Sequence, residues 1–551
     1  MRSLPVNLIS RLGVHQARLI HENMSSNLRQ RAVVSSFICT PPQTPTGLTF
    51  ALFKRSEEIR TYPPLIRNNV MTRTSGKWAV CSGSIDATDT SPENAAKREI
   101  LEETSLSDED IFLLRRGKPF SLIDENLKTQ WTIHPFAWQR KAHSKPIKLD
   151  WEHTEYRFIK PEELATLDHV PQLEIGLRRV LVSPDLERSL SVLKNDHESG
   201  AQALAIKALE LFLENVNSDE LSNITSPLEF WKEIRWRAWH LAKNGRPSMG
   251  AAIEASMFRS LDAVRKKLDD PGLRLKDGSE SDLRNLKKIL ETTLSERIST
   301  LQHTLSNLSD SFEKFIEKDQ EDYEGGAPKT TNIVTLSASG TVTAALSKLI
   351  PTHTKSGREI KLTILESRPK FEGVRVVNTL IKSFDSDPEI MKNFKVDIVS
   401  DASIASALED AHFLLLGADK VLPDGSVSNK IGSLTAALVA KKEPESKCKV
   451  LALYQSDKIT DSSFEGGHLK IETNDPSELM ESWPSKCTED IVGAQKAGWQ
   501  VEAKNRYFEW VPKALVDAHI TERGLLSQDD IGRIGNETRV LEEELFQDLS
   551  G

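Results

Sequence analysis

The chain of 551 residues is poor in cysteine and contains no long apolar run. Its four cysteines stand apart without a C-x-x-C spacing: Cys39, Cys81, Cys448 and Cys487. Such a distribution argues against a disulfide framework or a zinc site and fits a reducing compartment. Because no run reaches the length of a membrane span, we expect no membrane association. The 72 basic and 81 acidic residues form no basic stripe, so we expect no direct nucleic-acid binding.

The length predicts two to four domains, because one hydrophobic core rarely serves so long a chain. Residues 1–29 carry Arg2, Arg11 and Arg18 ahead of the first acid, Glu22. This composition fits either a disordered tail or a mitochondrial targeting segment. We expect a cytoplasmic protein, with a mitochondrial location as the alternative.

A helix-forming stretch after residue 90 gathers three carboxylates. It starts with a favourable N-cap, Ser91, and with Pro92 at the first helical position. Its apolar stripe consists of Ala95, Ala96, Ile100 and Leu101. Another face carries Glu99, Glu102 and Glu103 at i, i+3 and i+4, where like charges repel. A divalent cation such as Mg²⁺ relieves that repulsion, since it binds hard oxygen ligands and phosphates together. The alternative is a solvated acidic face.

The composition changes along the chain and divides it into regions. Residues 30–180 contain short strand-like runs around that helix, whereas residues 185–325 are rich in Leu, Ala, Lys and Glu at helical spacing. From residue 332, short apolar runs alternate with helices, which predicts a doubly wound parallel sheet with its ligand crevice at the C-terminal strand ends. Those ends carry Ser337, Ser339, Gly340, Glu366, Ser367, Arg368, Asp401, Gly417 and Asp419.

The order Gly83-Ser84-Ile85, followed by a helix of the pattern A-A-x-R-E-x-x-E-E, resembles the Nudix box. Nudix hydrolases cleave nucleoside diphosphates linked to another moiety. The resemblance implies an α/β/α sandwich over residues 30–180 and Mg²⁺ or Mn²⁺ as the cofactor. It also implies that the helix carries the catalytic and metal-binding residues Arg98, Glu99, Glu102 and Glu103.

An acid ahead of a late strand can complete the metal site in that family. The candidates are Glu152 and Glu155, of which we take Glu155 as the predicted ligand, with an exposed strand charge as the alternative. The box departs from the family pattern at Ser84, Thr90 and Ser105. Thr90 removes the acid that usually pairs with the box arginine, while the metal ligands are retained.

The C-terminal strand ends carry a second resemblance. The motifs are Glu366-Ser-Arg-Pro-x-x-x-Gly373, Gly417-Ala-Asp-Lys-Val-x-x-Asp-Gly425-x-x-x-Asn429-Lys430-x-Gly432, Asn505-Arg-Tyr-Phe-Glu-Trp-Val-Pro512 and Ile520-Thr-Glu-Arg-Gly524. They resemble the superfamily that joins the regulatory subunits of translation initiation factor 2B to two sugar-phosphate isomerases. These isomerases act on methylthioribose 1-phosphate and ribose 1,5-bisphosphate. The expected fold is therefore α/β: a Nudix sandwich, a helical subdomain at 185–325 and a Rossmann-like domain at 332–551.

The residue types at these strand ends suit a sugar phosphate. Arg368 offers a fork of donors, while Gly340 and Gly432 allow close approach beside helix N-termini, which attract anions. Asp419 is suited to move a proton between adjacent carbons, and Lys430 to polarise an oxyanion. The alternative is a structural ion pair between these two residues. Asn429 belongs to the same motif and is included among the binding residues.

Ser337 occupies the position at which the resembled isomerases carry a catalytic cysteine. A hydroxyl is a much poorer acid than a thiol near neutral pH. We therefore expect the second domain to retain a phosphate pocket that includes Ser337, with isomerisation in doubt.

Together the two resemblances predict a metal-dependent Nudix-type hydrolase of a nucleoside diphosphate derivative, fused to a domain that binds a sugar phosphate or nucleotide. One alternative is a non-catalytic protein of the initiation-factor-2B type. The other is an aldose–ketose sugar-phosphate isomerase. The second resemblance also implies a homodimer formed through the C-terminal domain.

Overall fold

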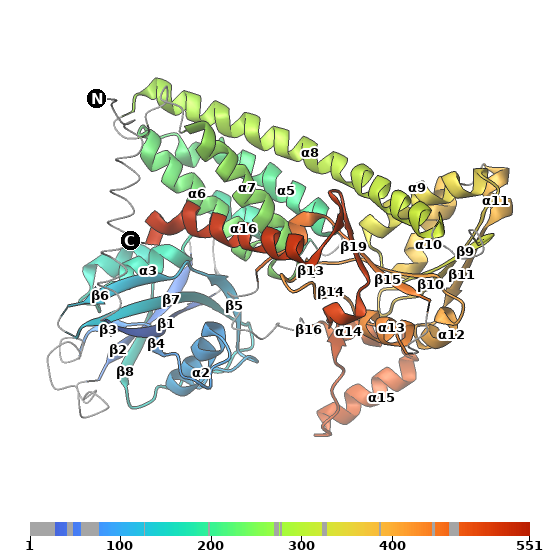
Figure 1. The fold of residues 1–551 in the computed structure, drawn as a ribbon. Helices are drawn as coiled ribbons and strands as arrows, with labels where there is room; N and C mark the ends of the chain where they lie inside the picture. Colours follow the sequence, from blue (N-terminus) through green and yellow to red (C-terminus); the bar gives the residue numbers. More distant parts are fainter. Residues whose placement is uncertain are drawn as a thin grey trace, which may run out of the picture. The chain divides into compact units, whose positions relative to one another are not determined.

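The computed structural model describes residues 28–40, 48–56, 76–125, 127–196, 199–268, 275, 278–321, 328–384, 387–442, 447–461 and 473–550. The predicted tail up to residue 27 lies outside these residues. The described chain forms two compact units (Figure 1). Unit 1 contains the residues up to Pro184 together with the C-terminal segment from Gln547, and unit 2 contains Asp185 to Phe546.

Unit 1 is built on an eight-stranded mixed sheet with the order β3-β2-β1-β7-β5, to which β4, β6 and β8 add by pairing with β1, β7 and β2. Its strands are β1 (Arg29–Thr40), β2 (Thr49–Arg55), β3 (Trp78–Ala79), β4 (Cys81–Ser84), β5 (Ile111–Arg116), β6 (Phe120–Asp124), β7 (Thr129–Arg140) and β8 (His153–Ile159). The helical elements are α2 (Pro92–Thr104), the 3₁₀ helix η2 (Pro161–Thr166) and α3 (Leu173–Val180).

The two faces of this sheet are covered by different helices. Neighbouring residues of β1 point to opposite faces, as in any strand. Val34 and Ile38 pack in one core cluster with α2, whereas Phe37 and Cys39 pack in the other with α3. The predicted α/β/α sandwich is thereby confirmed.

The C-terminal segment Gln547–Ser550 (η9) closes unit 1. Arg179, in the last turn of α3, donates from Nη1 to the carbonyl of Lys118 at 3.1 Å and from Nη2 to that of Leu549 at 3.0 Å. Its guanidinium also lies 4.7 Å from the ring centroid of Phe120. Unit 1 is therefore assembled from two segments that are far apart in the sequence.

Unit 2 begins with a helical subdomain that confirms the helical spacing read from the sequence. Its helices are α4 (Pro184–Asn195), α5 (Ala201–Val216), α6 (Pro227–Asn244), α7 (Gly250–Leu268) and α8 (Glu280–Glu321), with η3 (Asp219–Leu221) and η4 (Pro247–Met249) between them. The C-terminal helix α16 (Gln528–Phe546) packs against α7, where Phe546 meets Phe258 (Figure 1).

The rest of unit 2 contains a seven-stranded sheet with the order β11-β10-β9-β12-β15-β19-β20. The strands are β9 (Thr330–Thr335), β10 (Glu359–Leu365), β11 (Phe394–Val399), β12 (Phe413–Leu416), β15 (Lys449–Leu453), β19 (Ala518–Thr521) and β20 (Gly524–Leu526). All neighbours are parallel except β19 and β20. Because β9 lies between β10 and β12, the strand order reverses there, and this topological switch point opens a crevice at the C-terminal strand ends.

Helices cover both faces of this sheet, as a doubly wound fold requires. One core cluster joins the sheet to α8, α9 (Gly340–Lys355), α10 (Glu372–Phe384) and α11 (Pro388–Asn393). The other joins it to α12 (Ile404–Leu408), α13 (Ser433–Ala440) and α16. The remaining 3₁₀ helices are η5 (Asp401–Ser403), η6 (Ser456–Lys458) and η8 (Lys513–Leu515).

Two small sheets flank the crevice. The first consists of β13 (Lys420–Val421), β14 (Val427–Lys430) and β18 (Phe508–Val511), and the second of β16 (Thr473–Asn474) and β17 (Asn505–Arg506). Between β16 and β17 lie α14 (Pro476–Met480) and α15 (Ser485–Lys496), and neither helix has a buried residue.

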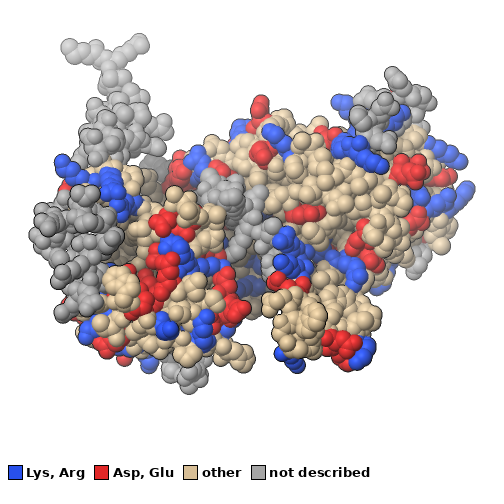
Figure 2. Space-filling model, turned by 90° about the horizontal axis from the view of Figure 1, so that it is seen from below, with Lys and Arg blue, Asp and Glu red and all other residues tan. Residues whose placement is uncertain are grey.

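Basic and acidic side chains are intermingled on the face drawn in Figure 2. Among the described helices, none combines the length and the apolarity that a membrane span needs.

Candidate functional site

The acidic helix of unit 1 forms as its sequence predicts. Ser91 caps α2 by accepting the N–H of Asn94 at 3.2 Å, and Pro92 occupies the first helical position. Ala95, Ala96 and Ile100 are fully buried, which confirms three members of the predicted apolar stripe. The prediction for the fourth member, Leu101, is wrong, since half of its surface is exposed. The helix ends at Thr104, and the C-cap residue Ser105, with a left-handed backbone (φ +61°), stands where the box has its glycine.

Arg98 has an acidic partner despite the loss of the box glutamate at Thr90. Asp89 accepts from Arg98 Nε at 3.2 Å and from Nη2 at 2.9 Å. The same guanidinium donates to the carbonyl of Ser84 at 3.0 Å, to Glu99 at 2.8 Å and to Glu102 at 3.3 Å. The bond to Arg98 lowers the pKa of Asp89. The acid that Thr90 removes from the box is thus replaced by Asp89, at the neighbouring position.

Gly83 makes room for the carboxylate of Glu99. A Cβ at this position would lie 2.0 Å from Glu99 Cδ and Oε1, closer than real Cβ contacts. The absence of a side chain on β4 is therefore what lets the carboxylate lie against the strand. Burial raises the pKa of Glu99, and the bond to Arg98 opposes that shift.

Glu103 is the most deeply buried of the three helix carboxylates, with 4% of its surface exposed. Its Oε1 accepts the N–H of Ser82 at 3.2 Å, and His153 Nε2 lies 3.8 Å from Oε2. Among the described residues, Oε2 has no hydrogen-bond donor. Burial raises the pKa of Glu103 well above its ordinary value, and the charges of Glu99 and Glu152 raise it further.

The predicted fourth ligand, Glu155, lies apart from this group. Its side chain is 54% exposed and forms an ion pair with Lys54 at 3.1 Å. Glu152 is the acid whose charge acts on both Glu99 and Glu103. Glu102 is 58% exposed and paired with Arg98. Glu155 thus lies apart from the helix carboxylates, whereas the charge of Glu152 acts on both Glu99 and Glu103.

The donor set of this group fits a hard divalent cation. A buried carboxylate oxygen without a donor, beside two further carboxylates of raised pKa, is relieved by Mg²⁺ or Mn²⁺. As the side chains lie, however, no group of three or more His, Cys, Asp or Glu residues in the described part of the chain is arranged to hold a metal ion. Side-chain movement of Glu102 or Glu152 would have to complete the coordination.

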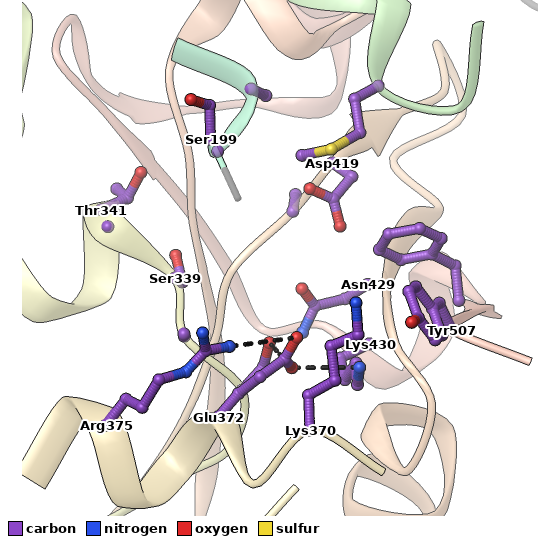
Figure 3. Close-up of a pocket in the computed structure, with 18 of the residues that line it drawn as sticks. Ser199, Ser339, Thr341, Lys370, Glu372, Arg375, Asp419, Asn429, Lys430 and Tyr507 are labelled. Carbon is purple, nitrogen blue, oxygen red and sulfur yellow. Dashed lines mark hydrogen bonds and ion pairs between the residues drawn. The ribbon is translucent and has the colours of Figure 1, made fainter. Parts of the chain in front are cut away.

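Unit 2 contains a cavity of about 1090 Å³ at the C-terminal ends of its parallel strands (Figure 3). Five cationic and four acidic side chains line it: Arg246, Lys370, Arg375, Lys430 and Lys458, and Glu372, Asp419, Glu478 and Glu481. Of the predicted binding residues, Ser337, Gly340, Asp419, Asn429 and Lys430 line this cavity. The crevice predicted at the C-terminal strand ends is therefore present and brings these residues together.

The N-terminus of α9 opens on the cavity. Ser339 caps this helix by accepting the N–H of Val342 at 3.3 Å, and a Cβ at Gly340 would meet nothing within 4 Å. A Cβ at Gly417, by contrast, would lie 2.7 Å from Ser339 Oγ, so a glycine lets the end of β12 approach the cap.

The second glycine predicted beside an anion site, Gly432, does not line the cavity. Glu509 Oε1 accepts the N–H of Gly432 at 2.6 Å and that of Leu434 at 2.8 Å. A side chain of β18 thus already occupies the N-terminus of α13.

Ser337 is held in a left-handed backbone conformation, with φ +68°. Its N–H donates to Ser367 Oγ at 2.7 Å, and its hydroxyl donates to Glu372 Oε2 at 3.2 Å. Such a backbone is uncommon for a residue with a side chain, so surrounding contacts must hold it. The hydroxyl therefore has a carboxylate beside it at the position where the resembled isomerases carry a thiol.

Glu372 also pairs with two cations of the cavity wall. Lys430 Nζ lies 3.1 Å and Arg375 Nη2 4.0 Å from its carboxylate oxygens, as the dashed lines in Figure 3 mark. The Lys430 ammonium also lies 4.4 Å from the ring centroid of Tyr507. The contact with Glu372 is electrostatic, since Lys430 has no acceptor with hydrogen-bond geometry among the described residues.

Asp419 lies on the far side of Asn429 from Glu372 in the view of Figure 3. Its backbone N–H bonds to the carbonyl of Ser428 at 2.9 Å. Buried Lys458 donates to the carbonyl of Ala418 at 2.6 Å; burial lowers the pKa of this lysine, and the charge of Asp419 opposes the shift. Asn429 donates to Ser433 Oγ at 2.9 Å. Lys430 takes Glu372 as its ion-pair partner, in place of the Asp419 pair considered from the sequence.

Arg368, the predicted phosphate fork, does not line the cavity. Its guanidinium donates to Ser482 Oγ after α14 and lies 5.8 Å from the ring of Phe371. The cations that do line the wall from this stretch are Lys370 and Arg375. The sequence analysis also did not predict Lys458, which lines the cavity and follows the C-terminal end of β15. Its place after a parallel strand is the signal that could have identified it, because ligands bind at the C-terminal strand ends of such sheets.

The fold and its two sites define a two-domain α/β protein, with a Nudix-type carboxylate helix in one domain and a cation-lined switch-point cavity in the other. Residues 65–180 match the NUDIX domain, and residues 197–528 match the Initiation factor 2 subunit family. Since the second match spans more than half of the chain, the protein belongs to the Initiation factor 2 subunit family.

Several curated proteins are similar to this chain. A ribose 1,5-bisphosphate isomerase of Haloterrigena turkmenica is 28% identical over 170 residues, which are 31% of this chain and 48% of that protein. A methylthioribose-1-phosphate isomerase of Xanthomonas campestris is 25% identical over 31% of this chain and 43% of that protein. The matched stretch thus spans less than half of these two relatives. A ribose 1,5-bisphosphate isomerase of Thermococcus kodakarensis is 25% identical over 56% of this chain and 81% of that protein.

Solved structures of the family are also similar. Translation initiation factor eIF-2B of Pyrococcus horikoshii matches with a TM-score of 0.41 and 17% identity, covering 63% of this chain and 98% of that one. The 5-methylthioribose 1-phosphate isomerase of the same organism matches with a TM-score of 0.42 and 18% identity, covering 65% and 88%.

Proposed function

We propose that the protein is a metal-dependent Nudix-type hydrolase of a nucleoside diphosphate derivative, and that unit 2 binds a sugar phosphate or nucleotide. The observation that carries the first half is the placement of two helix carboxylates: Glu99 lies against Gly83 and is held by Arg98, and Glu103 is buried with an Oε2 that has no hydrogen-bond donor among the described residues. Mg²⁺ or Mn²⁺, when bound, supplies charge neutralisation on the phosphates and activation of water. Glu103 and Glu99 hold the cation in this proposal, with Glu102 or Glu152 completing the ligand set.

The surrounding residues position these carboxylates. Asp89 fixes Arg98, Arg98 holds Glu99 from one side, and Gly83 admits Glu99 on the other. Such preorganisation matters, because a misplaced catalytic group loses most of its effect.

The test is hydrolysis of ADP-ribose, sugar nucleotides and dinucleotides, with and without Mg²⁺. We expect metal-dependent turnover of at least one of these compounds. In Glu103→Gln the kcat should fall by a factor of about 10² or more, which is the effect of removing one group that stabilises charge in the transition state. Glu109→Gln is the matched control, since this exposed glutamate of unit 1 lies outside the site. Absence of turnover across the panel, or equal rates in both variants, contradicts the proposal.

The second half of the proposal rests on the cavity of unit 2. A cavity of about 1090 Å³ with a helix N-terminus and five cationic side chains suits a phosphorylated metabolite. Calorimetric titration with sugar phosphates tests it. Lys458→Met, which removes a buried cation of the wall, is expected to weaken binding about tenfold or more, the effect of one charge-assisted hydrogen bond.

Isomerase activity is the second candidate, and the contact between Ser337 and Glu372 favours it. The carboxylate lies 3.2 Å from the hydroxyl and is placed to accept its proton, while Asp419 lines the same cavity. Conversion of a sugar 1-phosphate to its ketose form, followed by NMR, tests this activity. Turnover that disappears in Asp419→Asn supports it, and no turnover in the wild type rejects it.

A homodimer through unit 2 and a cytoplasmic location belong to the proposal, and a non-catalytic regulatory role of the initiation-factor-2B type is its alternative. Their support is the family membership of unit 2. Light scattering that shows only monomer at micromolar concentration contradicts the dimer.

A further inference from the structure

His153 is the first residue of β8 and lies on the face of the unit 1 sheet that α2 covers. The centroid of its imidazole is 5.3 Å from that of the Phe53 ring. Phe53 belongs to the core cluster that contains the buried residues of α2. The His153 side chain is almost wholly buried, with 3% of its surface exposed. A nitrogen donor is thus placed in the interior beside the carboxylate helix.

An irregularity in the pairing of β8 with β2 lies between two side chains of different orientation. Lys54 pairs with Glu155 and Arg55 with His153, so one step along β2 corresponds to two steps along β8. An extra residue in one strand bends that strand and re-aims its side chains. Glu155 is exposed and pairs with Lys54, whereas His153 is buried.

The two ring nitrogens of His153 have different neighbours. Nδ1 lies 3.3 Å from Asp150 Oδ1, and the same oxygen accepts the N–H of Glu152 at 3.1 Å. Because an ionised carboxylate can only accept, Nδ1 is the nitrogen that carries the proton in this contact. In the neutral ring Nε2 then presents a lone pair, and its neighbour is Glu103.

Two acceptor atoms therefore lie close together. His153 Nε2 and Glu103 Oε2 are 3.8 Å apart, which is too long for a hydrogen bond between them. Oε2 is buried and has no hydrogen-bond donor among the residues that the structure describes. A divalent cation between the two atoms can form bonds of about 2.1 Å to both.

The contact with Asp150 is one that metal-binding histidines share. A ligating imidazole usually donates its other N–H to a carboxylate, which fixes the tautomer and the orientation of the ring. Asp150 occupies this position, and the N–H of Glu152 holds its carboxylate in place. Carboxylate, imidazole and orphan carboxylate oxygen thus follow one another in the order that a metal site requires.

We infer that His153 Nε2 is a ligand of the unit 1 cation together with Glu103, and that the site therefore selects a first-row transition cation such as Co²⁺ or Zn²⁺ over Mg²⁺. The inference rests on the proposed metal-dependent hydrolase. Nitrogen is a good ligand for transition cations, whereas Mg²⁺ takes oxygen ligands and retains water. Mg²⁺ still binds through the carboxylates, but more weakly. Asp150 is a positioning residue, because it contacts the imidazole.

Calorimetric titration of the metal-free, full-length protein with Co²⁺ and with Mg²⁺ tests the inference without any substrate. We expect Co²⁺ to bind more tightly than Mg²⁺. His153→Gln offers an amide oxygen in place of the nitrogen, so the affinity for Co²⁺ should fall about tenfold or more, while that for Mg²⁺ stays within about threefold. The decisive quantity is the ratio of the two dissociation constants, because a general disturbance of the site weakens both cations.

Asp150→Asn keeps the inference testable if His153→Gln fails to fold. It retains an acceptor oxygen but removes the charge that raises the basicity of the imidazole, so the affinity for Co²⁺ should fall about tenfold and that for Mg²⁺ little. His143→Gln, at an exposed histidine of unit 1, is the matched control and should change neither affinity.

Two results would overturn the inference and leave the hydrolase proposal intact. One is a wild type that binds Mg²⁺ as tightly as Co²⁺, and the other is a ratio of dissociation constants that neither His153→Gln nor Asp150→Asn changes. Failure of both cations to bind at millimolar concentration refutes the proposed metal site itself, and the inference with it.

Discussion

The substitution Gly83→Ala should displace the carboxylate of Glu99 from its position against β4. The added Cβ would lie 2.0 Å from Glu99 Cδ and Oε1, whereas real contacts of this kind are at least 3.0 Å. Either the carboxylate or the strand must therefore move by ~1 Å, and a shift of this size at a catalytic group costs ~10²-fold in rate. That loss corresponds to about 3 kcal/mol of transition-state stabilisation.

The assay is metal-dependent hydrolysis of the best nucleoside diphosphate substrate, with kcat/KM measured over a Mg²⁺ titration. Ser84→Ala is the matched control, because the next residue is exposed and contributes its backbone carbonyl, not its side chain, to Arg98. We expect Ser84→Ala to stay within about threefold of the wild type, below the ~1 kcal/mol typical of a buried change. A folded Gly83→Ala protein with unchanged kcat/KM and unchanged Mg²⁺ dependence would refute the placement of Glu99.

Three further predictions concern stability, each measured by urea unfolding. Asp89→Asn should lower the free energy of unfolding of unit 1 by about 2 kcal/mol, because it removes the charge from a carboxylate that accepts two hydrogen bonds from Arg98. The substitution Asp86→Asn, at an exposed side chain, should have little effect. Glu509→Ala should cost unit 2 about 1 kcal/mol by uncapping α13. Burial lowers the pKa of His353 to about 4, so the folded state keeps this imidazole neutral. The unfolded chain then binds the extra proton between about pH 6.5 and 4, and His353 should contribute about 3 kcal/mol to the loss of stability as the pH drops through that window. His353→Leu should remove that contribution and leave those of His134 and His519, whose pKa values burial also lowers to about 4.

Local sequence signals were sufficient to predict elements whose ends are set by neighbouring residues, such as a helix cap. Ser91 and Pro92 predicted the start of α2, and the structure has the helix begin there. The apolar runs after residue 332, alternating with helices, predicted a parallel doubly wound sheet with its crevice at the C-terminal strand ends, and the structure has both. The predicted burial of Leu101 was wrong, because the spacing of apolar residues along a helix does not determine how wide the buried stripe is.

Contacts between distant segments could not be predicted. Glu509 reaches the N-terminus of α13 from β18, so a glycine motif that suggested an anion site proved to be already filled. Glu478 comes from a helix more than a hundred residues beyond Lys370, and nothing in its local sequence indicates that it lines the cavity. Even a short-range detail, the pairing of Asp89 with Arg98, depended on the path of the loop before α2.

The bond between Arg179 and the carbonyl of Leu549 affects how the protein is made on the ribosome. Domains of a long chain ordinarily fold as they emerge, the N-terminal one first. One contact of unit 1 forms later, because Leu549 leaves the ribosome only after the whole of unit 2. A nascent chain stalled within unit 2 therefore carries a NUDIX unit whose buried guanidinium still lacks its Leu549 acceptor. The stability of the unit translated first therefore depends in part on a residue that is translated after unit 2.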